Sequence, residues 1–247
     1  MKVALCLFGN VGYKQKLGGN NPEELETYDF TVPTKSIKDN ISLPHKADVF
    51  IHSWSKEHKK TLNDIFNPIK SVYEEPRNFS KHVMHKKNFI QSRWYSEFYS
   101  NNLKKKFEQE NNFTYDLVIH SRLDIVWFNN IILNSKPNTL FASHWNTTLN
   151  DNKLGPFNRE NIYQGYALHD WWFYGDSQTM NNLSNIYKHR YLLYLQNNRN
   201  WNGHRFPYLK SVNQKSSIEF VHYRGFDFEL YRRYIRNGWT NLEINNE

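Results

Sequence analysis

The segment 115–128, with the sequence YDLVIHSRLDIVWF, constrains the fold more than any other part of this chain. Residues 117–119 form an apolar run that is typical of a buried strand, and the charged residues Arg122 and Asp124 follow closely. In open α/β sheets, ligands collect at the carboxyl ends of strands, so charges placed there indicate a binding site. The carboxylate could hold a divalent cation, and the arginine could meet phosphate oxygens. A surface ion pair at the strand end explains the same two residues equally well.

The length and charge of the chain limit its class. A chain of 247 residues is long enough for one α/β domain, and we expect a single domain over residues 1–247. The mean hydropathy of -0.82 is low for a chain that is 17% aromatic. The net charge of +8 indicates a polyanionic partner: nucleic acid, an anionic membrane surface or a phosphorylated small molecule. Charge does not distinguish these three.

The single cysteine and the amino terminus indicate the compartment. Cys6 lies inside an apolar run, where it packs as a small core residue, and it has no second cysteine with which to form a disulfide. The amino-terminal apolar stretch of about six residues is shorter than a signal-peptide core. No segment approaches the roughly 18 apolar residues of a membrane span. We therefore expect a cytoplasmic protein without a membrane span.

Apolar runs and helical patterns alternate along the chain. We expect strands over 2–8, 47–54, 71–73, 117–119, 139–144, 170–174 and 218–223. Helices are expected over 91–111, 177–191 and 226–236, with a long loop or lid over 13–45. Helical crossovers between short strands predict a largely parallel sheet with helices on both faces. In the helix over 91–111, an aromatic stripe should face the core and Lys104, Lys105 and Lys106 should face solvent.

Four segments together resemble a known family: KVALCLFGNVG, ADVFIHSW, QSRWYSEFYSNNLKKKFEQENNFTYDLVIHSRLDIVWF and DWWFYGDSQTMNNLSNIY. They are similar to small nucleotide-sugar glycosyltransferases of the GT-A type, such as those of large DNA viruses and bacterial surface-glycan clusters. The similarity covers most of residues 1–190, and IEFVHYRG matches more loosely. It implies a GT-A-like, Rossmann-related domain with a donor nucleotide and metal half over 1–128 and an acceptor half over 129–247. A viral source would place the protein in the host cytoplasm.

The resemblance implies transfer of a sugar from a nucleoside diphosphate donor, such as a UDP-sugar, to a glycan acceptor. Family members carry a DxD-like motif after the central strand, but here Asp124 is its single acidic member. One carboxylate with waters and two phosphate oxygens can complete the shell of Mn²⁺ or Mg²⁺, and we expect such an ion. Arg122 could instead neutralise phosphate directly. His222 is the second expected ligand, although it could equally cap a strand end.

The remaining expectations concern Asp170, the residues that follow it and the residues that border the donor. Asp170 is expected to face the acceptor hydroxyl and remove its proton if the enzyme inverts, or to position the acceptor if it retains configuration. Trp171 and Trp172 could stack on pyranose rings or pack in the core. Asp176 is expected to cap the following helix. The residues expected to border the donor are Phe8, Gly9, Asn10, Val11, Arg93 and Arg122.

Two other classes of protein fit parts of the sequence. A nucleic-acid-binding protein would explain the charge and the aromatic residues, but the basic residues are spread along the chain without a recognition motif. A catalytically inactive relative that binds glycans would explain the reduced DxD motif. No HxH or HExxH pattern is present, so a dedicated zinc site is not expected.

Overall fold

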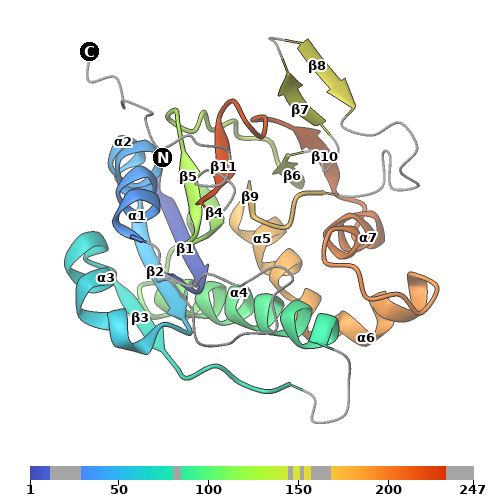
Figure 1. The fold of residues 1–247 in the computed structure, drawn as a ribbon, viewed down its shortest axis with the longest axis horizontal. Coiled ribbons are helices and arrows are strands. Elements are labelled where there is room, and N and C mark those ends of the chain that lie inside the picture. Colours follow the sequence, from blue (N-terminus) through green and yellow to red (C-terminus); the bar gives the residue numbers. More distant parts are fainter. Residues whose placement is uncertain (12–28, 80–84, 144–146, 151–152, 157–167, 232–247) are drawn as a thin grey trace.

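The computed structural model describes residues 1–11, 29–79, 85–143, 147–150, 153–156 and 168–231 (Figure 1). A seven-stranded mixed sheet lies at the centre, with helices packed against both faces. The chain is therefore an α/β protein, as predicted. Residues 13–28 of the loop or lid predicted over 13–45 lie outside the described residues. The described remainder is continuously helical from Thr31 to His45, so the prediction of a loop with one short helix was wrong there. None of the helices within the described ranges combines the length and apolar character that crossing a membrane requires.

The strand order in the sheet is β10-β6-β9-β4-β1-β2-β3. Their bounds are β1(Val3–Gly9), β2(Asp48–Ser53), β3(Lys70–Tyr73), β4(Leu117–Arg122), β6(Thr139–Ala142), β9(Trp172–Gly175) and β10(Ser217–Phe220). Strands β1 to β4 are mutually parallel, but β9 runs antiparallel to both β4 and β6. Between β6 and β9 in the sequence, β7(Thr147–Asn150) pairs antiparallel with β8(Lys153–Pro156).

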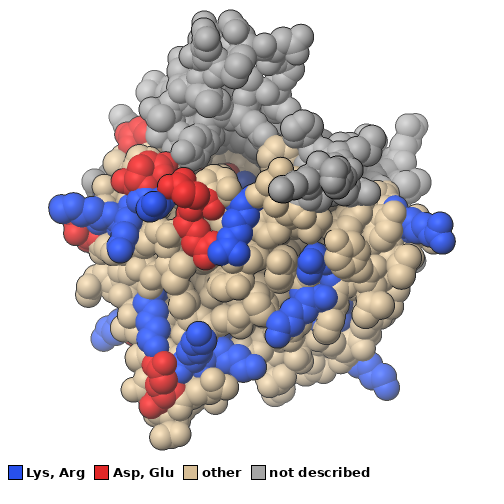
Figure 2. Space-filling view, turned by 90° about the horizontal axis from the view of Figure 1, so that it is seen from below, with Lys and Arg blue, Asp and Glu red and all other residues tan. Residues whose placement is uncertain are grey.

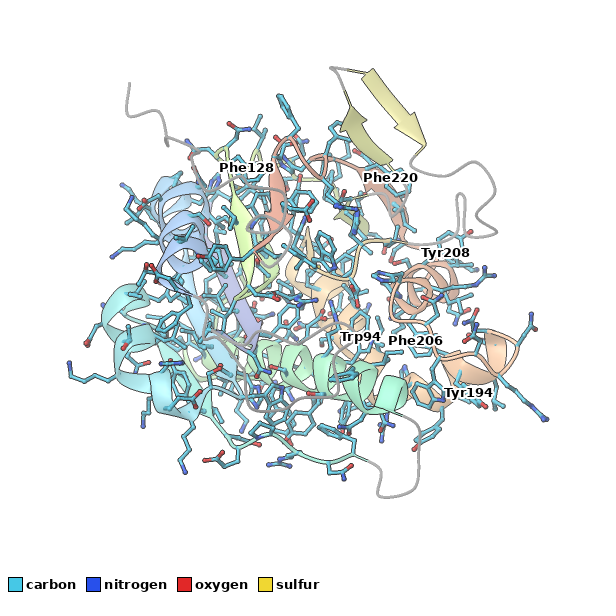
Figure 3. All side chains as sticks on the ribbon, in the orientation of Figure 1. Trp94, Phe128, Tyr194, Phe206, Tyr208 and Phe220 are labelled. Atoms are coloured by element: carbon cyan, nitrogen blue, oxygen red, sulfur yellow. The ribbon has the colours of Figure 1, made fainter. Side chains whose placement is uncertain are left out.

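The two faces of the sheet bury two separate cores. In β1, Val3, Leu5 and Leu7 point into one core, while Ala4 and Cys6 point into the other. The first core is covered by α1(Thr31–Ile37), the π-helix Lys38–Ser42 and α3(Lys59–Phe66). The second is covered by α4(His85–Glu110), α5(Ser177–Ser184), α6(Ile186–Gln196) and α7(Arg205–Asn213). In Figure 3, the fully buried Trp94 and Phe206 mark this second core between α4 and α7. The short helices α2(Leu43–His45) and Lys56–His58 complete the first half of the chain.

The face of α4 that meets the sheet is polar, which corrects one expectation. Lys104 is fully buried, and its Nζ lies 3.0 Å from Glu108, 2.7 Å from Ser177 and 2.9 Å from Asn181. The prediction that it faces solvent was therefore wrong, because a buried carboxylate and two polar partners satisfy its charge. Lys105 and Lys106 are exposed, as predicted. The polar residues buried along this face are Ser96, Glu97, Ser100, Asn101, Lys104 and Glu108.

Three predictions at the carboxyl-terminal half have different outcomes. Asp176 caps α5, because its Oδ1 accepts a hydrogen bond of 2.7 Å from the backbone N–H of Thr179. The predicted helix over 177–191 is two helices, since α5 ends before Asn185 and α6 follows. The helix predicted from residue 226 was wrong at its start: β11(Phe228–Leu230) pairs antiparallel with β5(Ile125–Trp127). Pairing with a distant strand overrides the local pattern there.

Candidate functional site

The candidate site lies at the carboxyl ends of β1 and β4. Strand order reverses at β1, which has β2 on one side and β4 on the other. Such a switch point leaves a crevice outside the carboxyl ends of the strands, where open α/β sheets bind ligands. Phe8 lies opposite Arg122 in the parallel register, and Leu123 N donates a 3.1 Å hydrogen bond to the Phe8 carbonyl. The two predicted donor segments are therefore neighbours.

The loop after β1 is held in a fixed conformation. Gly9 has a φ of +100, a left-handed conformation that glycine adopts without strain. Its N–H donates to Ser96 Oγ at 2.9 Å, and its carbonyl accepts from Ser53 Oγ at 2.8 Å. Val11 N donates to Ser55 Oγ at 3.0 Å. Phe8 and Val11 are buried and the Gly9 and Val11 backbone groups already have protein partners, whereas Asn10 is exposed, so Asn10 offers the polar groups of this loop to a ligand.

Arg122 and Asp124 form a bidentate ion pair at the end of β4. Arg122 Nε lies 2.7 Å and Nη2 lies 2.6 Å from the two carboxylate oxygens of Asp124. Their side chains are 22% and 29% exposed, so both are open to a ligand. The ion pair that the sequence left as an alternative is therefore present. A phosphate that binds here would replace Asp124 as the partner of Arg122.

Arg93 reaches this edge from α4 and is held by protein groups. Its Nε donates to the carbonyl of Asp170 at 2.9 Å, and its guanidinium forms an ion pair with Glu97. The guanidinium also lies over the Phe8 ring, with 4.8 Å to the ring centroid. Only 10% of the side chain is exposed. Arg93 thus links β1, α4 and the start of β9, which suits positioning of its neighbours more than direct phosphate contact.

Asp170 forms a pair with His204, which the sequence analysis missed. His204 precedes α7, and its Nδ1 lies 3.3 Å from Asp170 Oδ1 and 3.2 Å from the Leu168 carbonyl. Burial by itself would raise the pKa of Asp170, but the nearby His204, Arg93 and Arg122 hold that pKa below its ordinary value. Burial lowers the pKa of His204, against the attraction of Asp170. A carboxylate and an oxygen acceptor at Nδ1 fix the hydrogen there, which leaves the lone pair of the neutral ring on Nε2.

Gly203 leaves the space that this pair needs. Its position before His204 is the one feature of the sequence that could have pointed to the pair. A Cβ at Gly203 would lie 2.8 Å from Asp170 Oδ2, so any other residue would displace the carboxylate. A Gly-His step directly before a helix is too common to identify the pair without knowing which residue faces it.

A second buried layer supports Arg93. Glu97 is fully buried, and its Oε1 lies 2.8 Å from His120 Nδ1. The Nε2 of His120 lies 3.1 Å from Asn101 Oδ1. Charged and polar groups therefore run without interruption from the site into the interior beneath the sheet. Such a network is stable only while each member keeps its partner.

Trp171 and Trp172 lie in the core. They are 3% and 0% exposed, and their ring centroids lie 6.0 and 5.4 Å from that of Phe228. This geometry favours the packing interpretation over stacking on a sugar, because rings without accessible faces cannot hold a ligand. Large aromatic side chains commonly dominate cores in this way.

His222 faces other protein groups than Asp124. Its Nδ1 lies 3.8 Å from Asp227, and its Nε2 lies 3.2 Å from the Ile132 carbonyl. Both carboxylate oxygens of Asp124 already accept from Arg122. Within the described ranges, no group of three or more His, Cys, Asp or Glu side chains could hold a metal ion. These described side chains therefore fit a resident divalent cation poorly.

Comparison with protein-family models and with curated protein sequences gives no match for this chain. The site itself offers an arginine and a hydrogen-bonded glycine loop at the switch point, beside a carboxylate and histidine pair. Arginine suits binding of phosphate oxygens, and an Asp–His pair suits removal of a proton from a hydroxyl.

Proposed function

We propose that this protein is a glycosyltransferase that moves a sugar from a nucleoside diphosphate donor to a hydroxyl of a glycan acceptor. The observation that carries the proposal is the position of Arg122 beside the segment that holds the Asp170 and His204 pair, at the switch point of the sheet. The backbone N–H of Arg122 donates a 3.0 Å hydrogen bond to the carbonyl of Trp171, the residue after Asp170, so the two segments are direct neighbours. The resemblance of the sequence segments to GT-A enzymes supports the same reaction.

In this proposal the diphosphate lies against the Gly9 loop and Arg122. The loop supplies Asn10 and leaves open space at Gly9, which has no side chain, and Arg122 supplies a planar guanidinium that matches phosphate geometry. Binding would exchange the partner of Arg122 from Asp124 to the ligand. Asp124 would then lie beside the diphosphate, available to a cation that arrives with the donor.

The acceptor hydroxyl would lose its proton to His204. A hydroxyl is a weak nucleophile until a base shares its proton as the anomeric carbon is attacked. Asp170 would hold His204 in the tautomer with Nδ1–H and stabilise the ring once it is charged, as in other Asp–His pairs. This arrangement suits inversion of configuration. In it, Asp170 is a positioning residue that acts through His204.

Assistance by a metal ion, without strict dependence on it, remains a prediction. Mn²⁺ or Mg²⁺, when bound with the donor, would stabilise the charge of the leaving diphosphate. Asp124 is the described residue that could contact such an ion, and His222 would have to leave its present partners to join it. No step of the proposed mechanism requires the ion.

The test is to incubate the purified protein with a panel of UDP-, GDP-, ADP- and CDP-sugars and measure released nucleoside diphosphate by mass spectrometry, with and without glycan acceptors. Slow donor hydrolysis that Asp170→Asn removes is the expected result. A rise in the melting temperature of the protein with glycans, without hydrolysis of any donor, would indicate an inactive glycan-binding protein. Stabilisation by oligonucleotides that persists at moderate salt would indicate a nucleic-acid-binding protein.

A further inference from the structure

Helix α6 exposes an apolar surface at the side of the molecule. Tyr191, Leu192 and Leu195 are 56%, 62% and 56% exposed, whereas Ile186 and Leu193 on the opposite side are buried in the core. Their spacing of one and four residues places the three exposed side chains on one helical face. The helix thus carries apolar side chains on both its inward and its outward face. Among the described residues, no element packs over Leu192 and Leu195 on the outward face.

Cations flank this surface along the chain, and the surrounding segment contains no acidic residue. Residues 177–218 contain six Lys and Arg residues and no Asp or Glu. Lys188 is exposed one turn before the apolar residues, and Arg199 is exposed in the turn after the helix. In Figure 2, acidic residues gather on the left of the view, while the right side, where α6 lies in Figure 1, shows Lys and Arg among uncharged residues. We call Lys188, Tyr191, Leu192, Leu195 and Arg199 the α6 surface.

Amphipathic rings border the α6 surface. The ring of Trp201 stacks on Tyr194 at 5.1 Å between centroids and meets the edge of Tyr191 at 5.6 Å. Arg190 lies over the rings of Tyr187 and Tyr191 at 4.4 and 4.9 Å. Figure 3 shows Tyr194 at this outer corner of the molecule. Trp and Tyr rings that are half-buried beside cations suit a boundary between an apolar phase and water.

We propose that the α6 surface docks this protein on an anionic membrane surface. A bilayer boundary offers an apolar region for Leu192 and Leu195 and anionic headgroups for the flanking cations. Nucleic acid would satisfy the cations and the rings, but it offers no apolar phase for exposed leucines. A second copy of the chain would satisfy the leucines, but a two-fold contact would bring like charges together. The membrane surface is the partner that complements both properties.

The experiment is cosedimentation of the full chain with vesicles of phosphatidylcholine containing phosphatidylglycerol, compared with phosphatidylcholine alone. Binding is expected to the anionic vesicles, and to weaken with added salt. Leu192→Asp with Leu195→Asp should lower the partition coefficient about tenfold or more. Lys188→Glu with Arg199→Glu should lower it by roughly fivefold or more for each cation replaced. Because binding is measured without turnover, the result does not depend on the proposed transferase activity.

Matched controls change the same chemistry elsewhere. Leu43→Asp with Ile69→Asp alters two residues that are 58% and 43% exposed on other elements, and Lys105→Glu with Lys106→Glu changes the net charge equally. Both controls should bind as the wild type does, and circular dichroism should show that all variants fold.

Failure of the wild-type protein to bind anionic vesicles at low salt would overturn the proposal, as would equal loss of binding in control and α6 variants. Two further results would also overturn it. One is a concentration-dependent dimer, seen by light scattering, that Leu192→Asp abolishes while vesicle binding is absent. The other is oligonucleotide binding that the Lys188→Glu and Arg199→Glu changes remove in the absence of vesicle binding.

Discussion

His204 Nδ1 lies 3.3 Å from Asp170 Oδ1, so the residue before α7 and a residue two positions before β9 meet at the carboxyl edge of the sheet. The two residues come from different connections of the fold and share one site. Gly203 leaves the room for the carboxylate between them.

We expect Asp170→Asn and His204→Gln each to lower transfer by on the order of 10² to 10⁴, the usual effect of removing a base or its partner. Donor affinity, measured by thermal shift, should survive both changes. The double variant should be no slower than the worse single variant, because the two residues act as one unit. Multiplied losses in the double variant would show that they act separately, and loss of donor binding would place Asp170 in the nucleotide site.

Gly203→Ala should act on the same pair through space. The new methyl group would lie 2.8 Å from Asp170 Oδ2, so the carboxylate must turn away from His204. We expect a large fall in transfer with an unchanged midpoint of nucleoside diphosphate binding. Gly225→Ala is a matched control, since a Cβ there meets nothing within 4 Å although its φ of +82 adds backbone strain. Transfer by Gly203→Ala at the rate of the wild type would exclude a close role for the carboxylate.

A nucleoside diphosphate should raise the melting temperature even in the presence of chelator. At about 100 times its dissociation constant, a ligand stabilises the native state by roughly 2.7 kcal/mol, which corresponds to roughly 5–10 °C for a chain of this size. Arg122→Gln should remove most of this shift, and Lys105→Gln should leave it. A shift that requires Mn²⁺ or Mg²⁺ and disappears in Asp124→Asn would instead show that Asp124 holds a cation.

Glu97→Gln should destabilise the fold through Arg93 and His120. Removing one member of a buried ion pair costs about 3–5 kcal/mol, because the remaining charge stays buried without compensation. Urea unfolding should show this loss as a lower midpoint at constant slope. The control is Asp64→Asn, which breaks an exposed pair with Lys60 of the same i, i+4 spacing and should change the midpoint little. Equal effects of the two variants would contradict the buried network.

Stability should fall as the pH drops from 6.5 towards 4, partly because of His52. Burial, with a smaller contribution from Arg77, lowers the pKa of His52 from 6.5 to about 4. Above pH 6.5 both states are neutral, and below it the unfolded state binds a proton that the folded state resists. The full shift corresponds to about 3 kcal/mol. In His52→Asn, which can keep a bond to Ser96, the free energy of unfolding should vary less between pH 7 and 5; an unchanged slope would assign the effect to other groups.

The sequence by itself determined the features that are encoded within a few residues. The apolar runs predicted β1, β2 and β4, and the Asp176 cap depends on a residue three positions away. Arg122 and Asp124 could be placed at a strand end because they directly follow an apolar run. Periodicity and capping are local, so they can be recognised without knowing the fold.

Tertiary structure decided which distant groups meet. Lys104 is buried because Ser177 and Asn181 approach it from another helix, and the direction of β9, antiparallel to β4, depends on its partner strands and not on its own residues. His204 became a site residue only when α7 was packed beside the start of β9. The carboxylate beside Lys104 is Glu108, four residues away on the same helix, but the two polar partners that complete its burial lie 73 and 77 residues away in sequence. Local patterns contain no record of those distant partners.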